Sequence, residues 1–297
     1  MIAMPDRQCA RAMTSAQPGS KRMDVPSTPA AIGVFDSGVG GLSVLRAIQS
    51  QLPCHPIRYI ADQAHVPYGA RTRDEVREYS VGITRYLLSH GARVIVVACN
   101  SASAAALHHL RAVFPEIPFV GMEPAVKPAA EHTRSGVVGV LATPVTFQGE
   151  MYASVVDRFA KGITVLQDTC PGLVGQIESG RLNSPETRAI LESALRPMIA
   201  SGVDTVVMGC THYPFAIPLI QEIAGPEVLV IDPAPAVARQ TGRVLESRGL
   251  LAQECEALTP ARFFTTGDST QLVEMLPRLL GKAHDVQYLQ WENGILL

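Results

Sequence analysis

From residue 31 onward, the sequence alternates short aliphatic runs with longer stretches that carry apolar residues at helical spacing. This alternation is typical of parallel strands joined by crossover helices. The sequence therefore predicts an α/β fold with mostly parallel sheets flanked by helices. The expected strands cover residues 31–35, 57–61, 94–98, 118–121, 136–141, 164–167, 205–209, 228–231, 262–265 and 286–289, and clear helices cover 72–89, 185–200 and 235–248.

A weak internal repeat relates two halves of the chain. The run GVFDS at 33–37 resembles GVLAT at 139–143, and VVACNS at 96–101 resembles VMGCTH at 207–212. The two pairs recur at nearly the same spacing, which is longer than a solenoid repeat and indicates a duplicated domain. Because ligands bind beyond the carboxyl ends of parallel strands, we expect Cys99 and Cys210 on opposite walls of one cleft.

A cysteine that ends an aliphatic strand is most often a core residue. Here each cysteine is followed at once by hydrogen-bonding residues, Asn100-Ser101 after Cys99 and Thr211-His212 after Cys210. Two enzyme classes fit this pattern: a Cys–His acyl-transfer enzyme with one nucleophile, and an enzyme with two thiols as acid and base. The near-repeat favours the second, because inverting a carbon centre by proton transfer needs a group on each face.

Other motifs carry weaker signals. The glycine-rich turn at 36–41 follows a strand and can present backbone N–H groups to a carboxylate or phosphate, although Asp36 could instead cap a helix. The turn lacks the full dinucleotide-binding spacing. The loop at 62–69 should reach the rim of the cleft. Neither the histidine pair at 108–109 nor Lys127 has neighbours typical of a zinc or pyridoxal phosphate site, so we expect no metal and no cofactor.

Composition narrows the function classes. The 25 basic and 27 acidic residues are interspersed, which argues against nucleic acid or anionic lipid as the main partner. No segment is long and apolar enough to cross a membrane, and residues 1–30 are expected to form a disordered N-terminal extension. The six cysteines show no close pairing, which favours a reducing cytosol over a disulfide scaffold or zinc ribbon.

Together these motifs resemble those of the glutamate racemases, within the aspartate/glutamate racemase superfamily. The resemblance rests on VFDSGVGG at 34–41, Asp62 with PYG at 67–69, ACNSA at 98–102, EP at 123–124, CP at 170–171 with Glu178, and GCTHYP at 209–214. It implies two related, pseudo-symmetric α/β domains with the active site in the cleft between them. Domain 1 would comprise residues 31–122 plus 234–297, and domain 2 residues 123–233.

The resemblance also implies an activity: cofactor-independent interconversion of L- and D-glutamate, which supplies D-glutamate for peptidoglycan synthesis in the cytoplasm, by a protein that forms a homodimer. Cys99, assisted by Asp36, would act on the D-isomer. Cys210, assisted by His212 and with Glu178 nearby, would act on the L-isomer. The substrate's amino and carboxylate groups would be held by Asp36, Ser37, Pro67, Tyr68, Gly69, Asn100, Ser101, Thr211 and His212.

The sequence departs from the family pattern at two places. Ser101 stands where many members have Thr, which keeps the hydroxyl but loses a methyl group that restricts the rotamer. The run ATPVT at 142–146 replaces a common Gly-Thr pattern, so no role is assigned to Thr143 or Thr146. An aspartate racemase of the same superfamily, the Cys–His hydrolase and a non-enzymatic binding scaffold are the alternatives.

Overall fold

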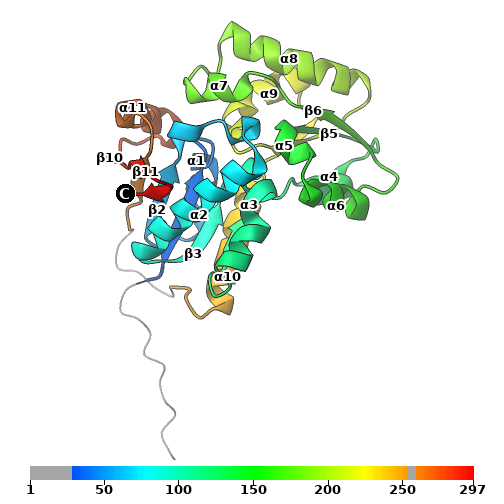
Figure 1. The fold of residues 1–297 in the computed structure, drawn as a ribbon. Helices are drawn as coiled ribbons and strands as arrows, with labels where there is room; N and C mark the ends of the chain where they lie inside the picture. Colours follow the sequence, from blue (N-terminus) through cyan, green and yellow to red (C-terminus); the bar gives the residue numbers. More distant parts are fainter. Residues whose placement is uncertain (1–28, 253–258) are drawn as a thin grey trace, which may run out of the picture.

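The structure is a computed structural model that describes residues 29–252 and 259–297 (Figure 1). The predicted disordered extension at residues 1–30 therefore lies outside the described residues, except for Pro29 and Ala30, which take no regular structure.

The larger of two sheets is formed by β1 (Ala31–Asp36), β2 (Ile57–Ala61), β3 (Ala92–Val97), β4 (Phe119–Gly121), β9 (Arg262–Thr265) and β10 (Val286–Tyr288). Across this sheet the strands follow the order β10-β9-β2-β1-β3-β4, and all pairs are parallel. The central strand β1 is buried along its whole length, as expected when helices cover both faces of a parallel sheet.

The smaller sheet is formed by β5 (Val137–Ala142), β6 (Thr164–Asp168), β7 (Thr205–Gly209) and β8 (Leu229–Ile231). Its order is β6-β5-β7-β8, again with parallel pairs. The chain thus passes from the larger sheet to the smaller after β4 and returns after β8. The exact domain boundaries expected at residues 122 and 233 stay a prediction.

Helices cover both faces of each sheet. Around the larger sheet these are α1 (Leu42–Gln51), α2 (Arg73–Ser89), α3 (Asn100–Val113), α10 (Ala234–Ser247) and α11 (Ser269–Leu280). Around the smaller sheet they are α4 (Val126–His132), α5 (Pro144–Phe147), α6 (Glu150–Phe159), α7 (Leu173–Glu178), α8 (Pro185–Ala200) and α9 (Ile217–Ala224). Short 3-10 turns lie at η1 (Gln63–His65), η2 (Tyr68–Ala70) and η3 (Tyr213–Ala216).

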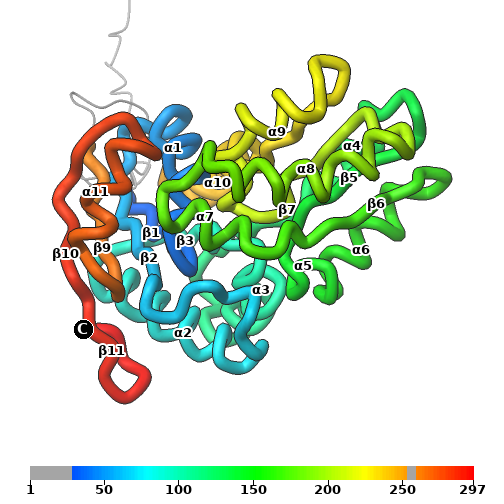
Figure 2. The backbone as a smooth tube through the Cα atoms, turned by 90° about the horizontal axis from the view of Figure 1, so that it is seen from above, coloured from blue at the N-terminus to red at the C-terminus, as the bar shows by residue number. Residues whose placement is uncertain are grey.

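Side-chain alternation along the strands divides the core of the larger sheet. In β3, Val94 and Val96 pack in the same cluster as apolar residues of α1, α10 and α11, whereas Ile95 and Val97 pack with those of α2 and α3. Figure 2 shows these two groups of helices on opposite sides of the sheet. Successive side chains of a strand point to opposite faces of the sheet, and here helices cover both faces. Most strand positions are therefore apolar, which explains the continuous aliphatic runs in the sequence.

The expected fold class is confirmed. Within the described residues each expected strand is found, with ends that agree within two residues, and the helices expected at 72–89, 185–200 and 235–248 correspond to α2, α8 and α10. Helix α2 begins after Thr72, which forms a reciprocal capping box with Glu75. No helix in the described part of the chain is long and apolar enough to cross a membrane.

Two features were not expected. The C-terminal residues form a small antiparallel hairpin of β11 (Trp291–Glu292) and β12 (Ile295–Leu296). Its turn residues Asn293 and Gly294 both have positive φ, which is the Asn-Gly signal of a tight hairpin. In addition, Cys54 takes part in a disulfide, which the wide cysteine spacing did not predict.

Candidate active site

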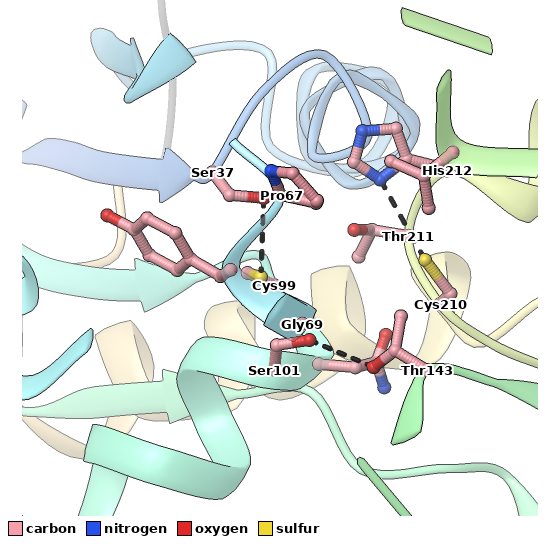
Figure 3. Close-up of a pocket in the computed structure, with 12 residues that line it drawn as sticks. Ser37, Pro67, Gly69, Cys99, Ser101, Thr143, Cys210, Thr211 and His212 are labelled. Carbon is pink, nitrogen blue, oxygen red and sulfur yellow. Dashed lines mark hydrogen bonds between the residues drawn. The ribbon is translucent and has the colours of Figure 1, made fainter. Parts of the chain in front are cut away.

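A cavity lies where the carboxyl ends of strands from both sheets meet. Cys99 follows β3 of the larger sheet, and Cys210 follows β7 of the smaller sheet. In Figure 3 the two sulfur atoms lie on opposite sides of this space. The cavity is lined by Ser37, Pro67, Tyr68, Gly69, Cys99, Asn100, Ser101, Thr143, Val174, Cys210, Thr211 and His212.

Cys99 is held at the N-terminus of α3. Its sulfur accepts a hydrogen bond from the backbone N–H of Ala102 at 3.4 Å and lies 3.9 Å from Oγ of Ser37. Burial and the nearby carboxylate of Asp36 raise the pKa of the Cys99 thiol well above its usual value, and the Ala102 N–H opposes this only in part. Cys99 is therefore a neutral thiol in this arrangement.

Asp36 lies at the end of β1 and is fully buried. One of its oxygens, Oδ2, accepts a hydrogen bond from the N–H of Gly41 at 2.8 Å, so the carboxylate does hold the turn that leads into α1. Within the described residues the other oxygen, Oδ1, has no hydrogen-bond partner. Burial raises the pKa of Asp36, opposed by the charge of His212 and by the Gly41 N–H. Asp36 thus both caps a turn and keeps one oxygen unpaired.

Cys210 has a different environment from Cys99. Its sulfur lies 3.8 Å from Nδ1 of His212, and Nε2 of the same imidazole lies 2.5 Å from Oε1 of Glu178. Burial opposes protonation of His212, but hydrogen bonds with Cys210 and Glu178 outweigh it and raise the pKa of His212 well above its usual value. Burial likewise opposes ionisation of Glu178, but its bonds with His212 and others lower its pKa. The pair is an imidazolium and a carboxylate beside the second thiol.

The glycine-rich turn after β1 packs directly against this pair. Glu178 Oε1 accepts a hydrogen bond from the N–H of Val39 at 2.8 Å. A Cβ atom on Gly38 would lie 1.9 Å from Glu178 Oε1, and one on Gly40 would lie 2.5 Å from His212 Nδ1. Neither position has room for a side chain, so the glycines serve the close approach of Glu178 and His212.

Asn100, unlike Asp36, lines the cavity and has unpaired polar atoms there. Its side-chain Nδ2 and Oδ1 both lack a hydrogen-bond partner in the described part of the chain, although the residue is only 3% exposed. Buried polar groups without partners cost about 1–3 kcal/mol each, so such groups usually pair with a ligand or water. The amide of Asn100 is therefore available to bind a polar ligand.

The structure brings the remaining expected contact residues to the cavity, with one difference. Ser37, Pro67, Gly69, Ser101 and Thr211 all line it. Tyr68 also lines the cavity, but its hydroxyl donates a hydrogen bond to Asp62 at 2.6 Å. Because that donor is already used, the Tyr68 hydroxyl is not free to donate to a substrate.

Thr143 and Val174 line the cavity although no role had been assigned to them. The Thr143 hydroxyl lies 3.0 Å from that of Ser101 and 3.0 Å from that of Thr146, so it connects the two walls. The internal repeat held a signal for Thr143, since it occupies the position that corresponds to Ser37 in the first half. Val174 lies on α7 and had no sequence signal.

Other motif residues lie elsewhere. Cys170 is free and buried in the main apolar cluster. Lys127 lies 3.8 Å from Glu131 on the surface of α4. Among the described residues no cluster of histidine, cysteine and acidic side chains has the arrangement of a metal site.

Comparisons with known proteins agree with these features. The sequence model of the Asp/Glu/Hydantoin racemase family matches residues 32–241. A curated glutamate racemase of Pseudomonas aeruginosa strain PAO1 is 51% identical over 257 residues, which are 86% of this chain and 96% of the relative.

Solved structures are similar as well. The glutamate racemase isoform RacE1 of Bacillus anthracis has a TM-score of 0.79 and 32% identity, over 90% of this chain and 98% of that one. The Escherichia coli glutamate racemase in complex with L-glutamate has a TM-score of 0.76 and 30% identity, over 88% of this chain and 99% of that one. The resemblance to glutamate racemases is thus confirmed, and the chain belongs to the Asp/Glu/Hydantoin racemase family.

Proposed function

We propose that this protein is a glutamate racemase that interconverts L- and D-glutamate with two cysteines and no cofactor. The observation that carries the proposal is the presence of Cys99 and Cys210 on opposite sides of one small cavity. Relatives and structural neighbours named glutamate racemase support glutamate as the substrate.

The reaction needs one proton removed and one delivered. A cysteine thiolate on one face of the substrate takes the α-proton, which breaks the C–H bond and leaves its electron pair on the α-carbon. The thiol on the opposite face then donates its proton to that carbon, and the configuration inverts. The first cysteine ends as a thiol and the second as a thiolate, so atoms and charge balance over the step.

The two thiols have neighbours that suit different starting states. The imidazolium of His212 beside Cys210 can stabilise a negative sulfur, whereas buried Cys99 beside Asp36 stays neutral. In this form Cys210 is the base for L-glutamate and Cys99 the acid. For D-glutamate the roles reverse, and the ammonium group of the substrate would offset the charge of Asp36, which makes ionisation of Cys99 less costly.

The α-proton of an amino acid is very weakly acidic, so the site must stabilise the carbanion. The unpaired amide of Asn100 and the hydroxyls of Ser37, Ser101 and Thr211 supply hydrogen-bonding groups for the substrate carboxylate, where negative charge develops. Because these residues are almost fully buried, water does not compete strongly for the same groups.

The wider biological setting belongs to the same proposal. By resemblance, the product D-glutamate would supply peptidoglycan synthesis in the cytoplasm, and the protein would act as a homodimer. Growth of a bacterial strain that requires D-glutamate, with and without this gene, tests whether the protein supplies D-glutamate. The mass of the purified protein in solution tests whether it is a homodimer.

The primary experiment follows L-glutamate in D₂O with protein freed of metal and pyridoxal phosphate. The circular dichroism signal should decay to zero while the α-proton signal disappears. Early in the reaction the D-glutamate formed should carry deuterium while the remaining L-glutamate keeps protium, because the donating thiol has exchanged with solvent. Aspartate is tested in parallel, and a faster reaction with aspartate would reassign the substrate.

Variants separate this mechanism from a Cys–His hydrolase. Cys99→Ala and Cys210→Ala should each abolish racemisation, whereas Cys170→Ala, which changes a free cysteine of the core, should retain it. Full activity in either of the first two variants would rule out the two-base mechanism. A covalent acyl adduct on Cys210 alone, detected by mass spectrometry, would support the hydrolase.

A further inference from the structure

A further buried carboxylate, which the proposed chemistry does not use, lies just after β2. Asp62 is fully buried, and its two oxygens contact four side chains. The distances are 2.9 Å to Nδ1 of His65, 2.6 Å to the hydroxyl of Tyr68, 2.7 Å to the hydroxyl of Thr266 and 2.8 Å to Nε1 of Trp291. A buried carboxylate with this many hydrogen bonds holds its donors in fixed positions.

Trp291 reaches Asp62 from the far end of the chain. It begins the C-terminal hairpin, and both Leu296 of the hairpin and Leu289 just before it are buried in the core on the α2 side of the sheet. The indole packs against α2 at Gly82, where a Cβ atom would lie 2.6 Å from the ring. The glycine therefore leaves a notch that lets the indole N–H point at Asp62.

Aromatic side chains surround the same carboxylate. The ring of His65 stacks on Tyr79 with centroids 3.8 Å apart, and Trp291 meets His65 edge-on at 5.6 Å. Tyr79 also contacts Tyr68, with centroids 5.9 Å apart. These contacts join the hairpin, α2 and the loop after β2 into one packed unit.

This packed unit borders the cavity through the loop after β2. Tyr68 donates to Asp62 Oδ2, while Pro67, Tyr68 and Gly69 all line the cavity. A change at Trp291 therefore reaches the cavity wall through one shared carboxylate, without any contact between Trp291 and the cavity itself.

We propose that Trp291 is a positioning residue, which acts through Asp62 to hold the segment Pro67–Gly69 in place against the substrate. This inference rests on the proposed function, because it concerns the binding of glutamate in that site. In the proposed mechanism this segment binds the substrate and transfers no proton, so a loss of positioning should raise KM more than it lowers kcat.

Trp291→Phe tests the proposal, since it keeps an aromatic ring and removes the N–H donor. KM for glutamate should rise about tenfold with kcat within about twofold, because small displacements of binding groups are costly. Tyr288→Phe is the matched control: it is the same kind of change nearby, on a tyrosine that is 57% exposed. If Trp291→Phe folds poorly, Gly82→Ala is the alternative variant. Its added methyl group would push the indole away, and it should give the same rise in KM.

The double variant Tyr68→Phe/Trp291→Phe distinguishes positioning from general destabilisation. If both residues act through Asp62, the double variant should show about the same KM as Tyr68→Phe alone, whereas independent effects would multiply. Trp291 is the single tryptophan of the chain, so its fluorescence offers a direct readout. Glutamate should shift the emission saturably in the wild-type protein, and the shift should shrink in Tyr68→Phe.

The outcomes separate the two proposals. An unchanged KM in both Trp291→Phe and Gly82→Ala, or multiplied effects in the double variant, would overturn the positioning role while racemase activity remained. An emission shift with glutamate but no racemisation would retain the link from Trp291 to the cavity and refute the racemase.

Discussion

Oε1 of Glu178 lies 2.5 Å from Nε2 of His212, and the same oxygen accepts the N–H of Val39 at 2.8 Å. The carboxylate comes from α7 beside the smaller sheet, and Val39 comes from the turn after β1 of the larger sheet. One oxygen therefore fixes the charge of the imidazole beside Cys210 and also joins the two walls of the cavity.

Replacing Glu178 by Gln should change the pH profile of racemisation. Glu178 helps to raise the pKa of His212, so its loss should lower that pKa, and the imidazolium beside Cys210 would disappear at a lower pH. The alkaline limb of kcat/KM should therefore move to lower pH, and kcat/KM near neutrality should fall about ten- to a hundredfold.

Because the two enantiomers have equal energy, kcat/KM must fall equally in both directions. Circular dichroism assays from pH 6 to 10 with each enantiomer measure the shift. Glu116→Gln, at an exposed position on the connection after α3, is the matched control. An alkaline limb at the wild-type position would argue against the role of Glu178.

The same pair should make stability depend on pH in both directions. The pKa of Glu178 is lowered in the fold from 4.5, so its contribution is present above pH 4.5 and is lost as pH falls through the lowered value. The pKa of His212 is raised from 6.5, so its contribution is complete below pH 6.5 and is lost as pH rises through the raised value.

Thermal melts of the wild-type protein and of Glu178→Gln/His212→Asn measure this contribution. The difference in Tm should be largest between pH 4.5 and 6.5 and should shrink at more acid and more alkaline pH. A difference that stays constant from pH 3 to 10 would show that the pair is not ionised in the fold.

Gly38→Ala should disrupt the site by displacing Glu178. The added Cβ would lie 1.9 Å from Glu178 Oε1, which is impossible without movement of the carboxylate. We expect kcat/KM to fall about a hundredfold, as displacement of a catalytic group by about 1 Å commonly costs. Gly175→Ala is the control on the same helix as Glu178, since a Cβ there meets no atom within 4 Å. Equal activities of the two variants would contradict this account of the turn.

Asp36→Asn should separate thiol reactivity from catalysis. After burial, the charge of Asp36 is the largest cause of the raised pKa of Cys99, so the amide should lower that pKa. Alkylation of Cys99 by iodoacetamide at pH 8 should become faster, while racemisation should fall by a factor of about 100 because the substrate loses a carboxylate partner. Mass spectrometry of the alkylated peptide measures the first effect, with Cys210 as the internal reference. Slower alkylation of Cys99 would contradict the assigned influence of Asp36.

Several features of the molecule were predictable from local patterns. Aliphatic runs separated by helical stretches specify parallel strands covered on both faces, and the expected strand positions agree with β1 to β10 within one or two residues. The duplicated motifs that end in Cys99 and Cys210 indicated two thiols on opposite walls of one space, because the carboxyl ends of parallel strands are where side chains converge.

The C-terminal hairpin shows the limit of local patterns. Asn293-Gly294 is a strong turn signal, but strands of two residues each have too little periodicity to be read from sequence. Likewise, the family resemblance places Tyr68 among the substrate-binding residues, whereas in the fold its hydroxyl donates to Asp62, a contact that no local pattern indicates.

The sequence alone determined the fold class, the positions of the strands along the chain and the two cysteine motifs that end β3 and β7, because these follow from residue types in short, recurring patterns. Tertiary structure decided which groups each cysteine meets. Val39 and Glu178 are separated by 139 residues, and Asp62 and Trp291 by 229. No spacing rule relates residues so far apart. Their contacts depend on how the two sheets and the C-terminal hairpin pack, and that packing sets the charge state of His212 and the position of Tyr68.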